Sequence, residues 1–428
     1  MQKTFYWLIG CLIFGGCQVG NVKSDVISAK HISPDIVVAA DGSGQFTTVQ
    51  QAVDSIPKDN RQRMVILIKN GVYHEKLRID ASFVTLRGES RGGTRIEFAQ
   101  MSEGRTDNVG PAVVNINGND TVLDNLTVKN TAGVIGPHEM AVYGTGDRVV
   151  ITNCDLLSEG ADTVSLWCRN GGKYYQANCS MRGAVDFVCP RGWCYIRDSQ
   201  FYETKNTAAI WHDGSKDQDM KFVLRDCKLD GIDGWNLARH HHDAQFFLLD
   251  CTFAKTMIDL PPKRVVYPLE ATQPSEADIQ KNKGLDSTNI WGERAYYEDC
   301  HRIGGDYAWF ADNLATAPGS PHQEQITARW TFADKWDPES KAGPTIQGVE
   351  RKDGEIAVTF SGDVTVKGKP RVMLADGMAC SYKSGSGTAT LFFEAKSDAK
   401  VKSVDLNGGA IVASQASAFD RDAQISLP

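Results

Sequence analysis

The sequence predicts an all-β protein in which a right-handed parallel β-helix is followed by a small β-sandwich domain. Two observations carry this prediction. A segment rich in aromatic and β-branched residues recurs along the chain at a regular spacing, and the last part of the chain alternates in short strands. With 428 residues, the chain has room for a large core and for more than one domain.

Each recurring segment ends in Asn or Asp followed by Cys or Ser. The six copies end at Cys154, Cys179, Ser199, Cys227, Cys251 and Cys300, which lie 25, 20, 28, 24 and 49 residues apart, the last step being about two periods. Self-similarity at this period is typical of a solenoid whose coils stack along one axis. We expect the repeated cysteines to form an inward ladder, because buried free cysteine packs as a small hydrophobe. Disulfides or a metal role are the alternatives.

The two ends of the repeat region carry different signals. Residues 50–56 have helical spacing and stop at Pro57, which predicts a short helix that covers the open first coil. Strands are expected to follow at 65–68 and 84–86. The β-helix domain is predicted to span residues 31–336 and to end at a linker rich in Pro, Gly and Ser.

Residues 344–428 are predicted to form the second domain. Short strands are expected at 356–360, 364–366, 371–374 and 388–393, separated by tight-turn signals. This segment resembles the immunoglobulin-like modules of bacterial surface proteins, particularly in Val358-Thr-Phe-Ser361 and Tyr382-Lys-Ser-Gly-Ser-Gly387. Since nothing in it indicates catalysis, we expect a spacer or a weak binding module.

The N-terminus has the pattern of a targeting segment. Lys3 precedes an apolar run over residues 5–14, which is too short to span a bilayer, and Gly15 and Gly16 lead to Cys17. We interpret residues 1–24 as a signal peptide with lipidation at Cys17; plain cleavage and release is the alternative. The prediction is an exported, periplasmic or cell-surface lipoprotein that touches the membrane only through this anchor. We expect it to be monomeric.

The charge balance narrows the class of partner. Lys and Arg number 46 against 53 Asp and Glu, so the formal net charge is −7. Such a balance provides no positive field for nucleic acid or for an anionic membrane surface. Any acidic ligand therefore has to meet local positive groups in a cleft.

Polar residues at the coil period indicate where chemistry would occur. His138, Asp162 and Asp186 are each 24 residues apart, and Arg239 follows 53 residues later. Stacked coils place such residues in columns about 4.8 Å apart. An arginine keeps a neighbouring carboxylate ionised, while a second carboxyl beside it can hold a proton, so that one acts as nucleophile or base and the other as general acid. Coincidental surface carboxylates are the alternative.

From about residue 36 to about 336 the chain resembles the pectin methylesterases. Six stretches carry the resemblance, in family order: Ala39-Ala-Asp-Gly-Ser-Gly-Gln-Phe-Thr-Thr-Val49, Lys69-Asn-Gly-Val-Tyr-His-Glu-Lys76, Asn125-Leu-Thr-Val-Lys-Asn-Thr-Ala-Gly133, Gly160-Ala-Asp-Thr-Val164, Gly183-Ala-Val-Asp-Phe-Val188 and Leu237-Ala-Arg-His-His241. Each stretch alone is weak, but their order over about 300 residues is specific.

The resemblance implies an esterase that releases methanol from methylated uronates in pectin without a cofactor. Asp186 would attack the ester carbonyl and form an acyl-enzyme. Asp162 would protonate the departing methanol and then activate water. Arg239 would pair with Asp186 and keep it charged.

The chain also departs from the family pattern. Ala161 stands where the family has an oxyanion-stabilising glutamine, and alignment places His138 at the other glutamine position, with Glu139 or Met140 as alternatives. Ser165, Cys189 and His241 replace family aromatics. We expect sugar contacts from other rings and predict a branched or decorated galacturonan as substrate; the candidate binding residues are Trp167, Trp193, Trp211, Trp235, His240 and His241.

Three other interpretations remain open. A pectin-binding solenoid without full catalytic machinery is the main one, because the glutamines are missing. A pectate lyase or polygalacturonase would use the same fold, but no carboxylate cluster for calcium stands at the matching positions. The run His240-His-His242 indicates a metal site only if a third ligand exists, and none is apparent in the sequence, so no metal is expected. Arg294, a second candidate arginine, is interpreted as structural.

Overall fold

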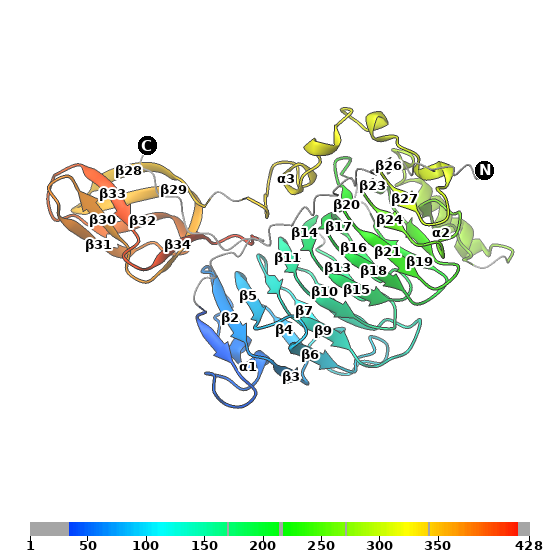
Figure 1. The fold of residues 1–428 in the computed structure, drawn as a ribbon, viewed down its shortest axis with the longest axis horizontal. Helices are drawn as coiled ribbons and strands as arrows, with labels where there is room; N and C mark the ends of the chain where they lie inside the picture. Colours follow the sequence, from blue (N-terminus) through cyan, green and yellow to red (C-terminus); the bar gives the residue numbers. More distant parts are fainter. Residues whose placement is uncertain (1–33, 169–170, 214–216, 270–271, 341–342, 418–428) are drawn as a thin grey trace, which may run out of the picture.

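The computed structural model describes residues 34–168, 171–213, 217–269, 272–340 and 343–417. Strands β1 to β27 form a β-helix of three parallel sheets, and each complete coil contributes one strand to sheet A, then to sheet B, then to sheet C (Figure 1). The predicted fold class is confirmed. The proposed signal peptide, including Cys17, lies outside the described residues.

Within each of the three sheets, the strands stack in the order of the chain. Sheet A consists of β1 (Ile36–Val38), β2 (Met64–Ile68), β5 (Val84–Gly88), β8 (Val122–Asp124), β11 (Val149–Thr152), β14 (Gly172–Ala177), β17 (Gly192–Arg197), β20 (Phe222–Arg225), β23 (Gln245–Leu249) and β26 (Arg294–Glu298). Sheet B consists of β3 (Gly71–Tyr73), β6 (Thr94–Phe98), β9 (Thr127–Asn130), β12 (Asp155–Leu157), β15 (Ser180–Gly183), β18 (Gln200–Glu203), β21 (Lys228–Gly231), β24 (Thr252–Phe253) and β27 (His301–Arg302). Sheet C consists of β4 (Leu77–Ile79), β7 (Ala112–Ile116), β10 (Met140–Gly144), β13 (Val164–Leu166), β16 (Val188–Pro190), β19 (Ala208–Trp211), β22 (Asn236–His240) and β25 (Lys263–Arg264).

The recurring Asn or Asp of the sequence repeat forms the corner between sheets A and B. Seven such corner residues have a left-handed backbone with φ between 49° and 56°: Asn125, Asn153, Asn178, Asp198, Asp226, Asp250 and Asp299. Asn and Asp adopt this conformation more readily than other residues with a side chain. The cysteines that follow these corners, such as Cys154 and Cys227, are free and point into the buried core of the solenoid.

Helices cover the solenoid at its start and along sheet A. The predicted first helix is present as α1 (Val49–Asp54), which buries Val49, Ala52 and Val53 against the first coil. Three 3-10 turns and a short helix follow the last coil: η1 (Ala308–Phe310), η2 (Leu314–Thr316), η3 (Gln323–Gln325) and α3 (Ala328–Thr331). The segment from Leu314 to Trp336 buries the outer face of sheet A in a second apolar cluster.

Helices α2 and α3 were not predicted, and α2 is the longer of the two. Helix α2 (Glu276–Asp286) lies between β25 and β26, starts at a capping box formed by Ser275 and Asp278, and buries only Leu285. Because most of its residues face solvent, its sequence has no apolar stripe of the kind by which helices are recognised.

The C-terminal residues form an antiparallel unit around a core of its own. Its strands are β28 (Ile346–Lys352), β29 (Glu355–Lys367), β30 (Arg371–Leu374), β31 (Ala379–Ser384), β32 (Thr388–Glu394), β33 (Val401–Asp405) and β34 (Ala410–Ala413). The stretches predicted as separate strands at 356–360 and 364–366 are one strand, β29, which pairs with β28 and β32 and, in its later part, with β34. Its core includes Ile356, Val372 and Phe393.

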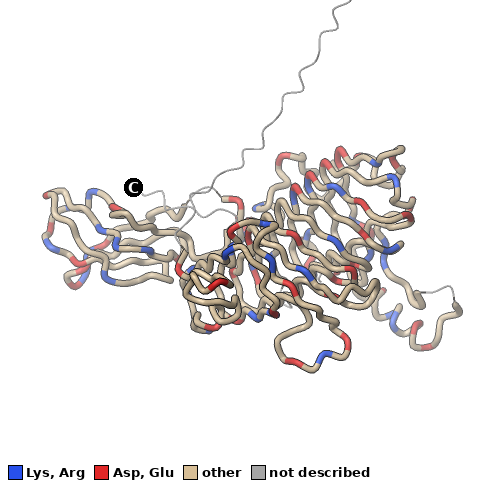
Figure 2. The backbone as a smooth tube through the Cα atoms, turned by 60° about the horizontal axis from the view of Figure 1, so that its bottom comes forward, with Lys and Arg blue, Asp and Glu red and all other residues tan. Residues whose placement is uncertain are grey.

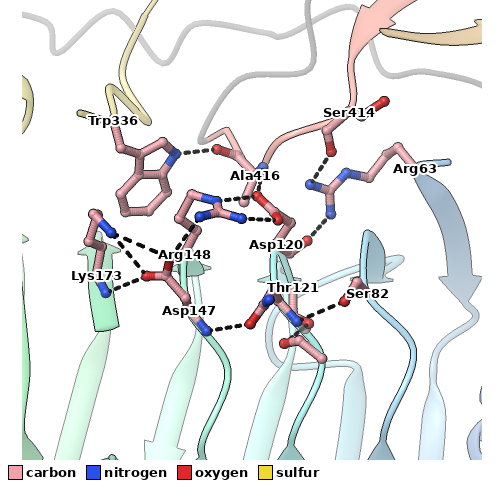
Figure 3. A network of polar contacts seen from close by, with 12 residues as sticks. Arg63, Ser82, Asp120, Thr121, Asp147, Arg148, Lys173, Trp336, Ser414 and Ala416 are labelled. Atoms are coloured by element: carbon pink, nitrogen blue, oxygen red, sulfur yellow. Dashed lines mark hydrogen bonds and ion pairs between the residues drawn. The ribbon is translucent and has the colours of Figure 1, made fainter. Parts of the chain in front are cut away.

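Polar contacts fix this unit to the early coils of the solenoid (Figure 3). Asp120 is fully buried and forms a bidentate ion pair with Arg148 at 2.7–2.8 Å, and its carboxylate also accepts the N–H of Ala416 at 3.0 Å. Arg63 donates to the carbonyl oxygen of Ser414 at 3.0 Å. The unit is therefore docked on the solenoid rather than joined to it only through a linker.

Acidic and basic residues are interspersed over the solenoid and the C-terminal unit (Figure 2), in agreement with the modest net charge of −7. Among the described residues, no helix is both long enough and apolar enough to cross a bilayer.

Candidate active site

The register of sheet C brings Asp162 and Asp186 together. Each aspartate stands two residues before a strand valine, and these valines, Val164 and Val188, are paired in neighbouring strands β13 and β16. Both aspartates have a left-handed backbone, with φ of 58° and 57°. Their side chains are recessed but not sealed, since Asp162 is 7% and Asp186 is 6% exposed. The structure thus places the two carboxyls at the same corner of successive coils.

Arg239 binds Asp186 from two coils further along the solenoid. Arg239 lies in β22, where it pairs with Trp211 of β19. Its guanidinium donates to both carboxylate oxygens of Asp186, from Nε to Oδ1 at 2.9 Å and from Nη2 to Oδ2 at 2.7 Å. Such a fork donates two parallel hydrogen bonds with fixed geometry. Asp186 is therefore both charged and oriented by its partner.

The two carboxyls have different surroundings. Burial raises the pKa of Asp162 to about 6; His138 and Arg191 oppose this rise and the charge of Asp186 adds to it. Burial also raises the pKa of Asp186, and the ion pair with Arg239 opposes it. Ser165 Oγ, at 3.4 Å, donates to Asp162, which has no ion pair among the described residues. Asp162 is thus suited to hold a proton, while Asp186 is held as the anion.

His138 lies in the coil directly before Asp162. It forms an isolated parallel bridge to Ala161, its side chain is half exposed, and its Nδ1 lies 2.5 Å from Glu103 Oε1. The alternatives Glu139 and Met140 are buried, and Glu139 is occupied by the N–H groups of Gly133 and Val134. Of the three residues weighed from the sequence, His138 is the one with an accessible side chain beside the aspartates.

A wall of aromatic and basic side chains runs beside the aspartates. The guanidinium of Arg191 lies 3.5 Å from the ring centre of Trp167, and the ring centres of Trp211 and His241 are 4.3 Å apart. His241 Nε2 contacts the hydroxyl of Tyr267 at 2.5 Å. Trp211 is nearly buried and the others are partly exposed, so the wall offers edges and faces to a ligand.

Two members of this wall were missed by the sequence analysis. Arg191 lies 24 residues after Trp167, the same step that links the two aspartates, so a search for cations at the coil period would have found it. Tyr267 lies in the insertion that carries α2, where Asn282 binds both its N–H and its carbonyl oxygen. The repeat does not extend into this insertion, and no sequence signal pointed to it.

For three of the predicted sugar-binding residues the prediction is wrong, because they lie elsewhere. Trp235 is fully buried in the solenoid core, and Trp193 belongs to sheet A, where it packs in the cluster beneath α3. His240 is 4% exposed and faces inward toward Phe246. It is the last residue of β22, between the outward Arg239 and His241, the residue that follows the strand. None of the three presents a free ring beside the aspartates.

Two further sequence interpretations concern nearby basic residues. Arg294 Nη1 binds the carbonyl oxygen of Gln218 at 2.7 Å and Gln245 Oε1 at 3.1 Å in sheet A, contacts that hold neighbouring segments together. His240 Nδ1 contacts the carbonyl oxygen of His242 at 2.9 Å. Within the described part of the chain, no three His, Cys, Asp or Glu residues are arranged to hold a metal ion.

Comparison with known proteins gives one family. The model of the pectinesterase family matches residues 35–248, half of the chain. Pectinesterase 4 of Arabidopsis thaliana is 35% identical over 193 residues, which are 44% of this chain and 31% of that protein, and a pectinesterase of Petunia integrifolia is 31% identical over 175 residues, 40% and 46%. The aligned part thus spans less than half the length of these relatives.

Solved structures show the same fold. Pectin methylesterase PemA from Erwinia chrysanthemi superposes with a TM-score of 0.56 at 17% identity, over 72% of this chain and 99% of that one. A pectin methylesterase in complex with a hexasaccharide superposes with a TM-score of 0.55 at 18% identity, over 72% of this chain and all of that one. With the family match and the shared fold, this chain belongs to the pectinesterase family.

Proposed function

We propose that this chain hydrolyses methyl esters of uronate residues in pectin and releases methanol. The proposal rests on the different surroundings of the two recessed carboxyls. Asp186 forms a bidentate ion pair with Arg239, whereas burial raises the pKa of Asp162 to about 6. A nucleophile and a proton donor of opposite protonation state are what ester hydrolysis by covalent catalysis requires.

In the first half of the proposed reaction, the ionised carboxylate of Asp186 attacks the ester carbonyl carbon. The tetrahedral intermediate collapses when its C–O bond to the methoxy group breaks, and Asp162 gives its proton to that oxygen, so that methanol leaves. The product on the protein is an acid anhydride between Asp186 and the uronate. Asp162 is now ionised and is suited to act as a base.

In the second half, Asp162 takes a proton from water while the water oxygen attacks the uronyl carbon. The anhydride bond breaks, which restores the carboxylate of Asp186 and the protonated form of Asp162. The uronic acid loses its proton to solvent. Arg239 binds the same two oxygens before and after the cycle, so it re-orients the nucleophile for each turnover.

The oxyanion of the tetrahedral intermediate needs a donor, and Ala161 has no side-chain donor for it. We assign this role to His138, whose half-exposed ring lies one coil before Asp162. A ring N–H of His138 can donate to an oxyanion. His138→Ala is expected to lower kcat by about 10²-fold, the usual loss for one oxyanion donor.

The substrate is proposed to lie along sheet C, against Trp167, Trp211 and His241. Arg191 beside them supplies the local positive charge that a polyuronate needs on a protein of net charge −7. A branched or decorated galacturonan remains our proposal for the chain that is bound. The test compares turnover on linear methylated pectin with turnover on branched fragments, and equal rates would contradict it.

The cellular setting is proposed from the sequence and from the family. We infer that the protein is exported, is anchored by a lipid at Cys17 and works as a monomer, with the C-terminal unit as a spacer or weak binding module. Mass spectrometry of the protein purified from its membrane fraction would show a diacyl or triacyl modification on Cys17. A free, unmodified N-terminus after cleavage would contradict the anchor.

The central experiment measures methanol release from methylated pectin. Wild type is expected to release methanol, and Asp186→Asn to lose at least about 10³-fold in kcat, because the amide is a poor nucleophile. Unchanged release in the variant would exclude Asp186. A wild type that binds pectin but releases no methanol would instead support the second candidate function, a pectin-binding solenoid, which is favoured by the lack of a donor at Ala161.

A further inference from the structure

A buried glutamate lies beneath the turn that carries Asp186. Glu203 ends strand β18, in the coil after that of Asp186, and its side chain is 0% exposed. Its Oε1 accepts the backbone N–H groups of Lys205 at 2.9 Å and of Val185 at 3.3 Å. Its other oxygen, Oε2, has no hydrogen-bond partner in the described structure. The proposed mechanism does not use this carboxyl.

The turn that Glu203 contacts is strained. Val185 and Asp186 are both left-handed, with φ of 43° and 57°. A β-branched residue such as valine is disfavoured in this conformation, which therefore persists only where surrounding contacts impose it. Three hydrogen bonds hold the backbone groups of the pair: Asp186 N–H to Ala208, Asp162 N–H to the Val185 carbonyl, and Val185 N–H to Glu203. Only the third of these bonds uses a side chain.

Glu203 has its own protonation state. Burial raises the pKa of Glu203 to about 8. The hydrogen bonds from the backbone N–H groups of Lys205 and Val185 oppose this rise, as does the charge of Lys205. The charge of Asp186 adds to the rise. Near neutral pH the carboxyl is therefore protonated and does not repel the nucleophile. A neutral carboxyl still accepts two N–H bonds through its carbonyl oxygen.

We propose that Glu203 is a positioning residue for the nucleophile, which through Val185 holds Asp186 in the orientation in which Arg239 binds both of its oxygens. The inference rests on the proposed esterase function but concerns a different residue and a different property. Glu203 does not touch substrate. It acts by fixing the backbone of Val185, so that the carboxylate of Asp186 needs no reorientation before it attacks.

The test compares three variants by kcat, KM and melting temperature. Glu203→Gln keeps the accepting oxygen and the neutral charge, whereas Glu203→Ala removes the acceptor. The control is Glu75→Ala. Glu75 also accepts two backbone N–H groups, those of Val49 and Gln50, both at 2.8 Å, but these belong to the first helix, away from Asp162 and Asp186.

Glu203→Ala is expected to lower kcat about 10- to 100-fold with KM within about twofold of wild type. Glu203→Gln is expected to stay within about threefold in kcat. Glu75→Ala should lower the melting temperature and leave kcat unchanged. If Glu203→Ala behaves like Glu75→Ala, with lower stability and normal kcat, Glu203 is merely structural and the proposal is wrong.

The pH profile gives a second signature. Both proteins should lose kcat above about pH 6, where Asp162, the proposed proton donor, ionises. Wild type is expected to show a second, steeper fall above about pH 8, where Glu203 ionises beside Asp186, and Glu203→Gln should lack this second fall. The profile must be read with Lys205 intact, since its charge also faces Glu203. Identical alkaline limbs in wild type and Glu203→Gln would overturn the proposal.

A failure of the esterase function would be distinguishable. If wild type releases no methanol, hydrogen exchange of the segment around Val185 and a crystal structure still test the positioning claim. Glu203→Ala should then speed exchange at the Val185 amide and change the contact between Asp186 and Arg239, and Glu203→Gln should do neither. An unchanged contact and unchanged exchange in Glu203→Ala would refute it.

Discussion

The backbone N–H of Asp162 donates a hydrogen bond, 3.3 Å long, to the carbonyl oxygen of Val185, the residue before Asp186. One peptide group therefore connects the turns of the two aspartates, and their separation is set by the main chain rather than by flexible side chains. Because Asp162 and Val185 are both left-handed, this link depends on the coil corners as much as on the strands.

Arg239→Lys is expected to lower kcat by about 10²-fold. Lysine keeps the positive charge but cannot donate two parallel bonds to Asp186, so the carboxylate loses its fixed orientation. Because Arg239 opposes the rise in the pKa of Asp186, the weaker partner should also move the acid limb of the pH–rate profile to higher pH. Methanol release measured from pH 4 to 8 checks both effects. An acid limb that moves to lower pH would contradict the proposed pairing.

Asp162→Asn is expected to stabilise the fold at neutral pH while it abolishes turnover. The pKa of Asp162 rises to about 6 in the folded protein, so its contribution to stability is full below about pH 4 and is lost as pH rises through 6. A shift of about two units corresponds to about 3 kcal/mol as an upper value. Urea unfolding at pH 7.5 and pH 4 should show a gain at the first pH and little difference at the second. A gain of equal size at both pH values would contradict the shift.

Arg191→Met is expected to raise KM for polyuronate about tenfold with little change in kcat, because it removes a charge that binds substrate rather than one that reacts. One charge-assisted bond contributes about 1.5 kcal/mol, which is about tenfold in affinity. Arg182→Met is the control, since Arg182 lies 4.9 Å from the ring centre of Tyr202 on sheet B. Equal KM increases in the two variants would show that the effect is general electrostatics.

Arg148→Met is expected to destabilise the protein by about 2–3 kcal/mol, because it leaves the buried carboxylate of Asp120 without its cation. The contact of Asp120 with Ala416 should weaken as well, so the C-terminal segment should become more sensitive to protease. Arg371→Met breaks an exposed pair with Asp405 and should cost less than about 1 kcal/mol. If both variants unfold alike in urea, the docking contact is not a source of stability.

Much of the site was predictable because a solenoid turns sequence distance into spatial distance. The step of 24 residues placed Asp162 and Asp186 in one column, and the repeat ending in Asn or Asp indicated the period of the coils. The same rule failed for side-chain direction. Ser165 donates to Asp162 although the two are three positions apart, an odd spacing that puts strand residues on opposite faces. The contact forms because Asp162 lies outside the strand and has a left-handed backbone.

The burial of individual side chains was a second property that the sequence did not predict. Trp193, Trp211 and Trp235 look alike in the chain, yet one lies beneath α3, one beside the aspartates and one in the core. Which faces of the coils are covered depends on segments far away in sequence, such as residues 314–336 over sheet A and the insertion that holds Tyr267 against His241. No local pattern records these contacts.

The sequence by itself determined the stacked coils, the corner residues and the pair of aspartates, since each follows from a short-range repeat and from the conformations that Asn, Asp and β-branched residues prefer. Only the tertiary structure decided that Arg239 binds both oxygens of Asp186, that Arg191 faces Trp167, and that Glu203 is buried beneath Val185. These relationships depend on the exclusion of water and on the register between coils, which set hydrogen-bond partners and pKa values and which are properties of the packed molecule.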